Sequence, residues 1–130
     1  MGIFRVKAHI WNPLDPSKSR DEELLVDTGA TYTVIPRDVL EALDVKILRH
    51  VKLRLADNRV TEKPVGEVGI EIEGYRASAT PVVFGDPNIY ILGSVTMEQL
   101  GLAPDPITKK LRPVEALLMK LKEHRNSSKL

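Results

Sequence analysis

Short segments in which apolar and polar residues alternate recur along this chain of 130 residues. In the first of them every second side chain is apolar, which is typical of a strand with one buried face, at Phe4, Val6, Ala8 and Ile10. Further apolar or alternating segments follow at residues 23–26, 32–35, 51–55, 65–72, 77–83 and 89–92. Turn-forming residues separate them at 12–17, 56–59, 74 and 86–88. The pattern predicts a mostly β domain of short strands, with an exposed loop at residues 12–17.

Two short helices are expected between these strands. Pro36 suits the first turn of a helix and predicts one over residues 37–43. A second helix is expected with Ser94 as its N-cap and Gly101 as its end.

The C-terminal region allows two interpretations. Residues 111–121 fit either a helix with one apolar stripe or an alternating strand. We assign residues 1–121 to a single domain and residues 122–130 to a flexible C-terminal tail.

Composition excludes several classes of function. Nineteen Lys and Arg against eighteen Asp and Glu give a net charge of +1, too small an excess for a dedicated nucleic-acid or polybasic membrane surface. The chain has no Cys, which rules out disulfides, thiol nucleophiles and thiolate metal sites. No apolar run near the N-terminus approaches the length of a secretory signal, so a cytoplasmic protein is expected.

The segment Leu24–Ala30 carries the clearest chemical signal. It places the carboxylate of Asp27 at the tip of an apolar strand, where desolvation can change its pKa. Thr28 adds a hydroxyl that can lock the loop, and Gly29 allows a tight turn and close approach to a ligand. Taken alone, the same triplet is also compatible with a β-turn in which Asp is the capping residue.

A second element lies downstream, where the apolar run Ile89–Leu92 ends at Gly93 and leads into the expected helix. Together with Asp27-Thr28-Gly29-Ala30, it makes residues 3–102 resemble the retropepsin-like aspartic proteases, and the short archaeal and bacterial versions in particular. The resemblance implies a closed or partly open β-barrel with one or two short helices. It also implies an aspartic endopeptidase that needs no cofactor.

The resemblance also implies roles for individual residues. Asp27 would be the catalytic carboxylate, Thr28 would hydrogen-bond across a dimer axis, and Gly29 and Ala30 would orient Asp27 and contact substrate. Further positions would line or support the substrate pocket (Val34 and Ile35), form the tip of the substrate-covering flap (Ala56, Asp57, Asn58 and Arg59) and pack beneath the catalytic loop (Ile91, Leu92 and Gly93).

The chain departs from the retroviral pattern at two places. Retroviral enzymes have acidic residues just after the catalytic motif and an Arg just after the later Gly, and these pair with each other. Thr31, Tyr32 and Ser94 occupy those positions here, so both partners are missing together. The flap tip also lacks Gly, which predicts a different flap mobility and substrate range.

Only one such motif exists in the chain. None of the seven other aspartates is followed by Thr-Gly or Ser-Gly, and they are Asp15, Asp21, Asp38, Asp44, Asp57, Asp86 and Asp105. Carboxylate-based peptide hydrolysis uses two Asp side chains that share one proton. The second Asp27 must then come from another copy, which predicts a homodimer with its two-fold axis at the catalytic loops and residues 111–121 as a candidate dimer element.

Other kinds of site find little support. His9, His50 and His124 are isolated in the sequence, so no metal site is expected. No Ser-centred nucleophile elbow and no phosphate-binding glycine loop occurs. The expected partners are thus a second copy and a peptide or protein substrate, without nucleic acid or membrane. The alternative function is a non-catalytic dimeric domain that binds extended peptides in the same cleft.

Overall fold

The computed structural model describes residues 4–118. The strands are β1 (Arg5–Asn12), β2 (Asp15–Val26), β3 (Thr33–Pro36), β4 (Arg49–Arg54), β5 (Val60–Ile72), β6 (Tyr75–Gly85), β7 (Ile91–Leu92), β8 (Leu102–Asp105) and β9 (Lys110–Pro113). The two helices are α1 (Arg37–Ala42) and α2 (Ser94–Leu100). The expected mostly β architecture with two short helices is confirmed.

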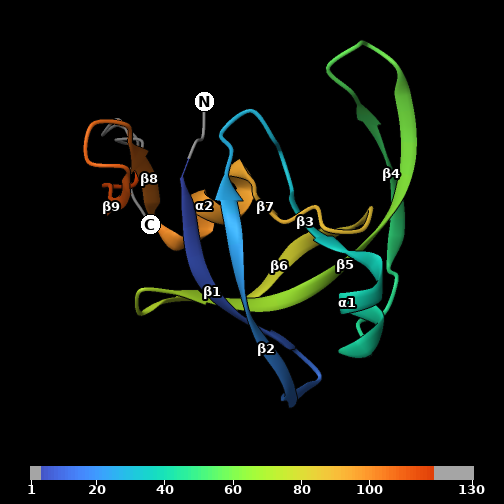
Figure 1. Cartoon of the computed structure of the whole chain (residues 1–130). Helices are drawn as coiled ribbons and strands as arrows, with labels where there is room; N and C mark the ends of the chain where they lie inside the picture. Colours follow the sequence, from blue (N-terminus) through green and yellow to red (C-terminus); the bar gives the residue numbers. More distant parts are fainter. Residues whose placement is uncertain (1–3, 119–130) are drawn as a thin grey trace, which may run out of the picture.

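Seven strands form one sheet in the order β1-β2-β7-β3-β6-β5-β4. Strand β1 also pairs with β5, through His9 with Glu71, Ile10 with Ile70 and Trp11 with Gly69. This additional pairing bends the sheet back on itself into the ring that Figure 1 shows. The expectation of a partly open barrel is confirmed. The inner face of the ring holds the core, whose fully buried members include Ile10, Leu24, Ile70 and Leu92.

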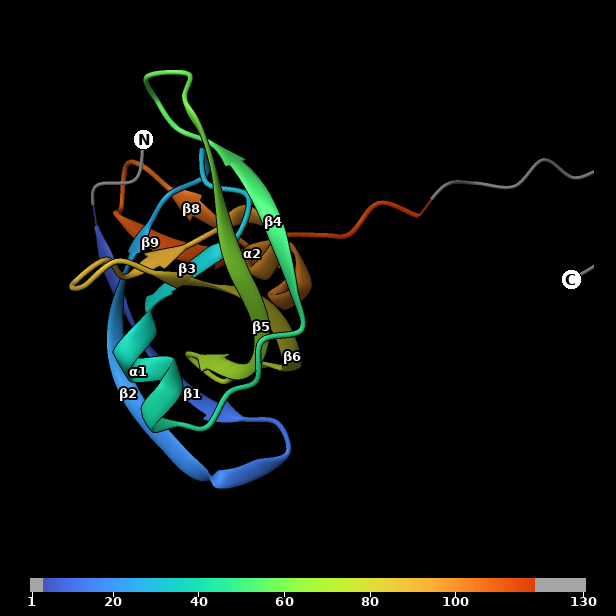
Figure 2. The same cartoon turned by 90° about the vertical axis from the view of Figure 1, so that its right-hand side faces the viewer.

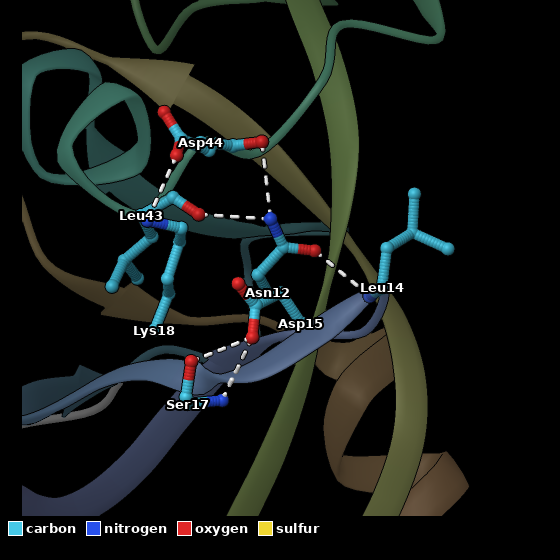
Figure 3. A network of polar contacts seen from close by, with 7 residues as sticks. All are labelled: Asn12, Leu14, Asp15, Ser17, Lys18, Leu43 and Asp44. Atoms are coloured by element: carbon cyan, nitrogen blue, oxygen red, sulfur yellow. Dashed lines mark hydrogen bonds and ion pairs between the residues drawn. The ribbon is translucent and has the colours of Figure 1, made fainter.

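The β1–β2 hairpin differs from the expected loop at residues 12–17. Only Pro13 and Leu14 form the turn, and β2 begins at Asp15. The buried side chain of Asn12 explains the tight reversal, because its Oδ1 accepts from the Leu14 N–H at 2.8 Å. Its Nδ2 donates to the carbonyls of Leu43 and Asp44 at 2.9 and 3.1 Å (Figure 3). One amide thus shapes the turn and also ties it to the end of α1.

The expected breaks at Gly74 and residues 86–88 are correct, but the strands before and after Gly74 are longer than predicted. Strands β5 and β6 have 13 and 11 residues. Their reversal is tight because Glu73 and Gly74 both have positive φ angles, 52° and 86°. The expected turn at residues 56–59 is also present, with Asn58 in the left-handed conformation at φ 73°.

Both helices form where they were predicted, with one correction. Helix α2 ends at Gly101, which has a left-handed φ of 70° as expected of a C-cap. Ser94 is not the N-cap, because the helix begins with Ser94 itself and Gly93 precedes it without a side-chain cap. None of the helices in the described part of the chain is long and apolar enough to cross a membrane.

The C-terminal region forms a short strand at Lys110–Pro113 and no helix among its described residues. Leu111 is buried in β9, which pairs with β8 in a separate two-stranded sheet. Residues 114–118 have no regular structure, and Leu117 and Leu118 are exposed there. The helical interpretation is therefore wrong for residues 111–118, and the strand interpretation is correct only as far as Pro113. The remainder of the 111–121 segment and the predicted tail at 122–130 lie outside the described residues.

Candidate active site

Asp27 follows directly after β2, at a point where three strands meet. Strand β7 pairs in parallel with the end of β2 and antiparallel with β3. The backbone N–H of Asp27 extends this pairing by one residue, because it donates to the carbonyl of Leu92 at 3.1 Å. The position of Asp27 is thus determined by a segment far away in the sequence.

The loop after β2 turns around the carboxylate. The Gly29 N–H donates to Asp27 Oδ1 at 2.9 Å, and the Ala30 N–H donates to the Asp27 carbonyl at 3.1 Å. A Cβ at residue 29 would lie 3.2 Å from Oδ1, so only Gly leaves this contact unstrained. Asp27 is half-buried, while Thr28 is exposed. The loop therefore orients one carboxylate oxygen and presents the Thr28 hydroxyl to the outside.

Helix α2 supports this loop from below. Its first residue Ser94 donates its backbone N–H to the carbonyl of Ala30 at 2.8 Å, and Val95 donates to Thr31 at 3.0 Å. Gly93 lies so close that an added Cβ would overlap the backbone of Tyr32. The structure thus brings Leu92 and Gly93 beneath the predicted catalytic loop.

Three buried threonines, which the sequence analysis did not single out, complete the support. The hydroxyl of Thr96 lies 2.6 Å from that of Thr33 and 2.7 Å from that of Thr80. Thr33 Oγ1 also accepts from the Gly93 N–H at 3.1 Å. All three side chains are completely buried, so their hydroxyls depend on one another for hydrogen bonds. The signal in the sequence was a polar residue at a core position in each of three elements.

A half-buried apolar face adjoins the loop. Leu25 lies beside Ile91 on the neighbouring strand, and Ile91 lies beside Val34 on the next. Their neighbours along the strands, Leu24, Leu92 and Ile35, are completely buried. Because side chains alternate between the two faces of a sheet, Leu25, Ile91 and Val34 point away from this core. The row continues through the register with Val83 and Val65, which are buried. Val34 therefore lies where a pocket residue is expected, whereas Ile35 belongs to the core beneath it.

The predicted flap is the hairpin of β4 and β5. Figure 2 shows that it extends well beyond the rest of the domain. Its tip is closed by hydrogen bonds from the Leu55 N–H to the Arg59 carbonyl at 2.8 Å and from the Asn58 N–H to the Leu55 carbonyl at 2.9 Å. Arg59 Nε also pairs with Asp57 Oδ2 at 2.6 Å. The structure brings the four predicted tip residues together, and all of them are exposed.

A model of the aspartyl protease family matches residues 19–102, which include the Asp27 loop, the flap hairpin, β7 and α2. The chain belongs to the aspartyl protease family. A search of curated proteins finds no match.

Two further features help to delimit the site of this aspartyl protease domain. Within residues 4–118, no cluster of three or more His, Asp or Glu side chains could hold a metal ion. A groove of about 770 Å³ lies elsewhere, on the outer face of β1 and β2, and none of its lining residues belongs to the Asp27 loop. Tyr90 lines this groove, and burial raises the pKa of its phenol, with a further increase from Glu22. The groove and the Asp27 loop are thus separate features of the domain.

Proposed function

We propose that the chain is an aspartic endopeptidase whose catalytic dyad consists of Asp27 from each of two identical chains. The observation that carries the proposal is the way in which the Asp27 loop is held. Hydrogen bonds from Gly29 and to Leu92 orient a half-buried carboxylate beside an apolar face, within a chain of the aspartyl protease family. Preorganised groups of this kind lower a barrier because they need no rearrangement during the reaction.

The chemistry requires two carboxyl groups in different protonation states. Two carboxylates a few ångströms apart do not both ionise, so they share one proton. The ionised group removes a proton from a water molecule, which attacks the scissile carbonyl. The protonated group donates a hydrogen bond to the carbonyl oxygen and stabilises the tetrahedral intermediate, and the carboxyl that took the proton from water then gives it to the amide nitrogen as the C–N bond breaks. Each Asp27 takes one of these roles.

The second carboxyl group comes from a second chain in this proposal. The sequence has a single Asp-Thr-Gly, and Thr28 is exposed beside Asp27. A two-fold axis at this loop would bring each Asp27 to its counterpart and would allow each Thr28 hydroxyl to bond across the axis. The extended peptide would then lie between the loops and the flap hairpin.

The direct test is Asp27→Asn, assayed on a peptide library. We expect kcat/KM to fall by about 10³-fold or more, because the amide can neither activate water nor share a proton. Asp38→Asn, which alters an exposed carboxylate in the first turn of α1, is the matched control and should retain activity. Full activity in Asp27→Asn would refute the role of this residue.

A mixing experiment tests the shared dyad separately. Wild-type chains are allowed to exchange with an equal amount of Asp27→Asn chains. If one dimer needs two Asp27 residues, activity per wild-type chain falls to about half, because half of the wild-type chains are then in mixed dimers. Unchanged activity per wild-type chain, or an active monomer in sedimentation, would contradict the proposal.

The second candidate is a non-catalytic domain that binds extended peptides. Strand β4 favours it, because β4 is the last strand of the seven-stranded sheet and an edge strand can pair with a peptide. A statine-containing peptide that mimics the tetrahedral intermediate should raise the melting temperature in either case. Turnover of the library, blocked by that inhibitor, would occur only in the endopeptidase.

A further inference from the structure

Positive charge is concentrated in one part of this chain. Residues 46–63, which contain β4, the flap tip and the start of β5, hold six Lys and Arg but only two carboxylates, Asp57 and Glu62. The other residues hold thirteen Lys and Arg and sixteen Asp and Glu. A nearly neutral protein thus consists of a hairpin with a net charge of +4 on a domain with a net charge of −3.

Several of these cations have no acidic partner in the part of the chain that the structure describes. The ion pairs of the hairpin join Arg59 to Asp57 and Lys63 to Asp86. Lys46, Arg49 and Lys52 are exposed and form no ion pair within residues 4–118. The positive potential of the hairpin is therefore not cancelled locally.

The charge continues onto the face that carries the apolar row. Strand register places Val51 opposite Lys63 and Arg49 opposite Val65, and Val65 lies beside Val83 in that row. Lys63 Nζ reaches Asp86 Oδ1 at 2.9 Å, and the Asp86 side chain is 73% exposed. An ion pair this open is weak and can exchange its carboxylate for that of a ligand. Arg49 and Lys63 therefore adjoin the apolar row along the hairpin.

We propose that the preferred substrates of this site are extended peptides with Asp or Glu residues flanking the scissile bond, which the basic flap hairpin attracts and holds. The inference rests on the proposed endopeptidase function and names its substrate class. Rim charges of this kind mainly speed association and select between partners, and salt screens their effect.

Protection of an edge strand and binding of nucleic acid are two further roles that basic hairpins perform, and both fit this hairpin less well. Charged residues on an edge strand such as β4, Lys in particular, prevent aggregation, but that role does not account for Lys46, Arg59 and Lys63, which lie outside β4. Nucleic acid is the other class of polyanion. Residues 46–63 contain no Phe, Tyr or Trp, so the hairpin lacks the usual platform on which the bases of a single strand stack.

The test compares two peptides with the same apolar cleavage site, one flanked by Glu and Asp and the other by Gln and Asn, at about pH 6, where side-chain carboxylates are ionised. We expect the wild type to prefer the acidic peptide by about tenfold in kcat/KM at low salt. The double variant Arg49→Glu with Lys63→Glu, which reverses the two cations on the face of the apolar row, should abolish that preference. The control, Lys109→Glu with Lys110→Glu in the β8–β9 hairpin, changes the net charge equally and should preserve it.

A binding measurement separates failure of this inference from failure of the proposed function. Fluorescence anisotropy of the two peptides with Asp27→Asn should show the same acidic preference and its loss in the charge-reversed hairpin. Equal affinity for both peptides would overturn the inference, even if the wild type cleaves them. Absence of cleavage together with retained acidic preference would overturn the endopeptidase only. A labelled single-stranded oligonucleotide that binds the hairpin while the peptides show no preference would overturn the inference in favour of nucleic acid.

Discussion

The catalytic loop and the flap tip are both short turns between strands, yet they are held in very different ways. The loop at residues 27–30 is fixed by partners distant in sequence, including the Leu92 carbonyl and the first turn of α2. The tip at residues 55–59 bonds only to itself and to the adjoining end of β4 among the described residues. The first arrangement fixes the backbone around a carboxylate, whereas the second holds the tip by local contacts alone. We expect this difference of the proposed endopeptidase, because its carboxylates need fixed positions during the reaction, while its flap has to move for substrate to enter.

The largest effect on this comparison should come from Gly93→Ala. The added Cβ would overlap the Tyr32 backbone, which cannot yield without displacing the catalytic loop. We expect the free energy of unfolding in urea to fall by about 3 kcal/mol. Gly74→Ala is the matched control, since its Cβ meets nothing within 4 Å and only its left-handed φ adds a cost of about 1 kcal/mol. Equal losses in both variants would show that the loop is not tightly supported.

Thr96→Val should have the next largest effect. It removes the hydroxyl that joins Thr33 and Thr80 while the shape stays nearly the same. Two buried hydroxyls then lose a partner, so we expect a loss of about 1–3 kcal/mol in the same unfolding experiment. Thr96→Ser retains the hydroxyl and should lose less. A Ser variant as unstable as the Val variant would assign the effect to packing instead.

Asn58→Ala should affect the flap tip alone. Ala tolerates the left-handed φ of this residue poorly, at a cost of about 1 kcal/mol. Since the tip can open without the rest of the domain, we expect faster hydrogen exchange at the Leu55 and Asn58 amides. The free energy of global unfolding should fall by no more than about 1 kcal/mol, which is the cost of the strained φ itself. Asn58→Gly should exchange at nearly the wild-type rate. A large loss of global stability would show that the flap is part of the cooperative core.

Asp57→Asn should give the smallest effect. The ion pair with Arg59 joins side chains that are 55% and 75% exposed. Pairs of this kind contribute between 0 and about 1 kcal/mol and weaken with salt. We therefore expect a change in urea unfolding below about 0.5 kcal/mol at low salt, and none at high salt. A larger, salt-independent change would mean that the tip is more firmly built than its contacts indicate.

The sequence predicted the elements that are encoded locally. Alternation predicted β1, Pro36 predicted α1, and Gly101 predicted the end of α2. The Asp-Thr-Gly loop and the apolar run before Gly93 predicted the family, because each motif consists of a few adjacent residues.

What the sequence did not predict depends on contacts between distant segments. Asn12 was assigned to an exposed loop, yet it is buried because α1 offers two carbonyls as partners. The hydroxyls of Thr33, Thr80 and Thr96 meet only after three elements have packed. The lengths of β5 and β6 likewise depend on their pairing with each other.

The parallel pairing of β2 with β7 determines when, during synthesis of the chain, the Asp27 loop can form. Leu25 and Val26 pair with Ile91 and Leu92, and Asp27 bonds to the Leu92 carbonyl, so the loop cannot close until the ribosome has released most of the domain. Closing such a long stretch of chain is slow compared with forming a hairpin. A nascent chain, or one truncated before β7, therefore carries Asp27 without positioning it. If Asp27 acts as proposed, no active site can form before β7 has been synthesised and has paired with β2.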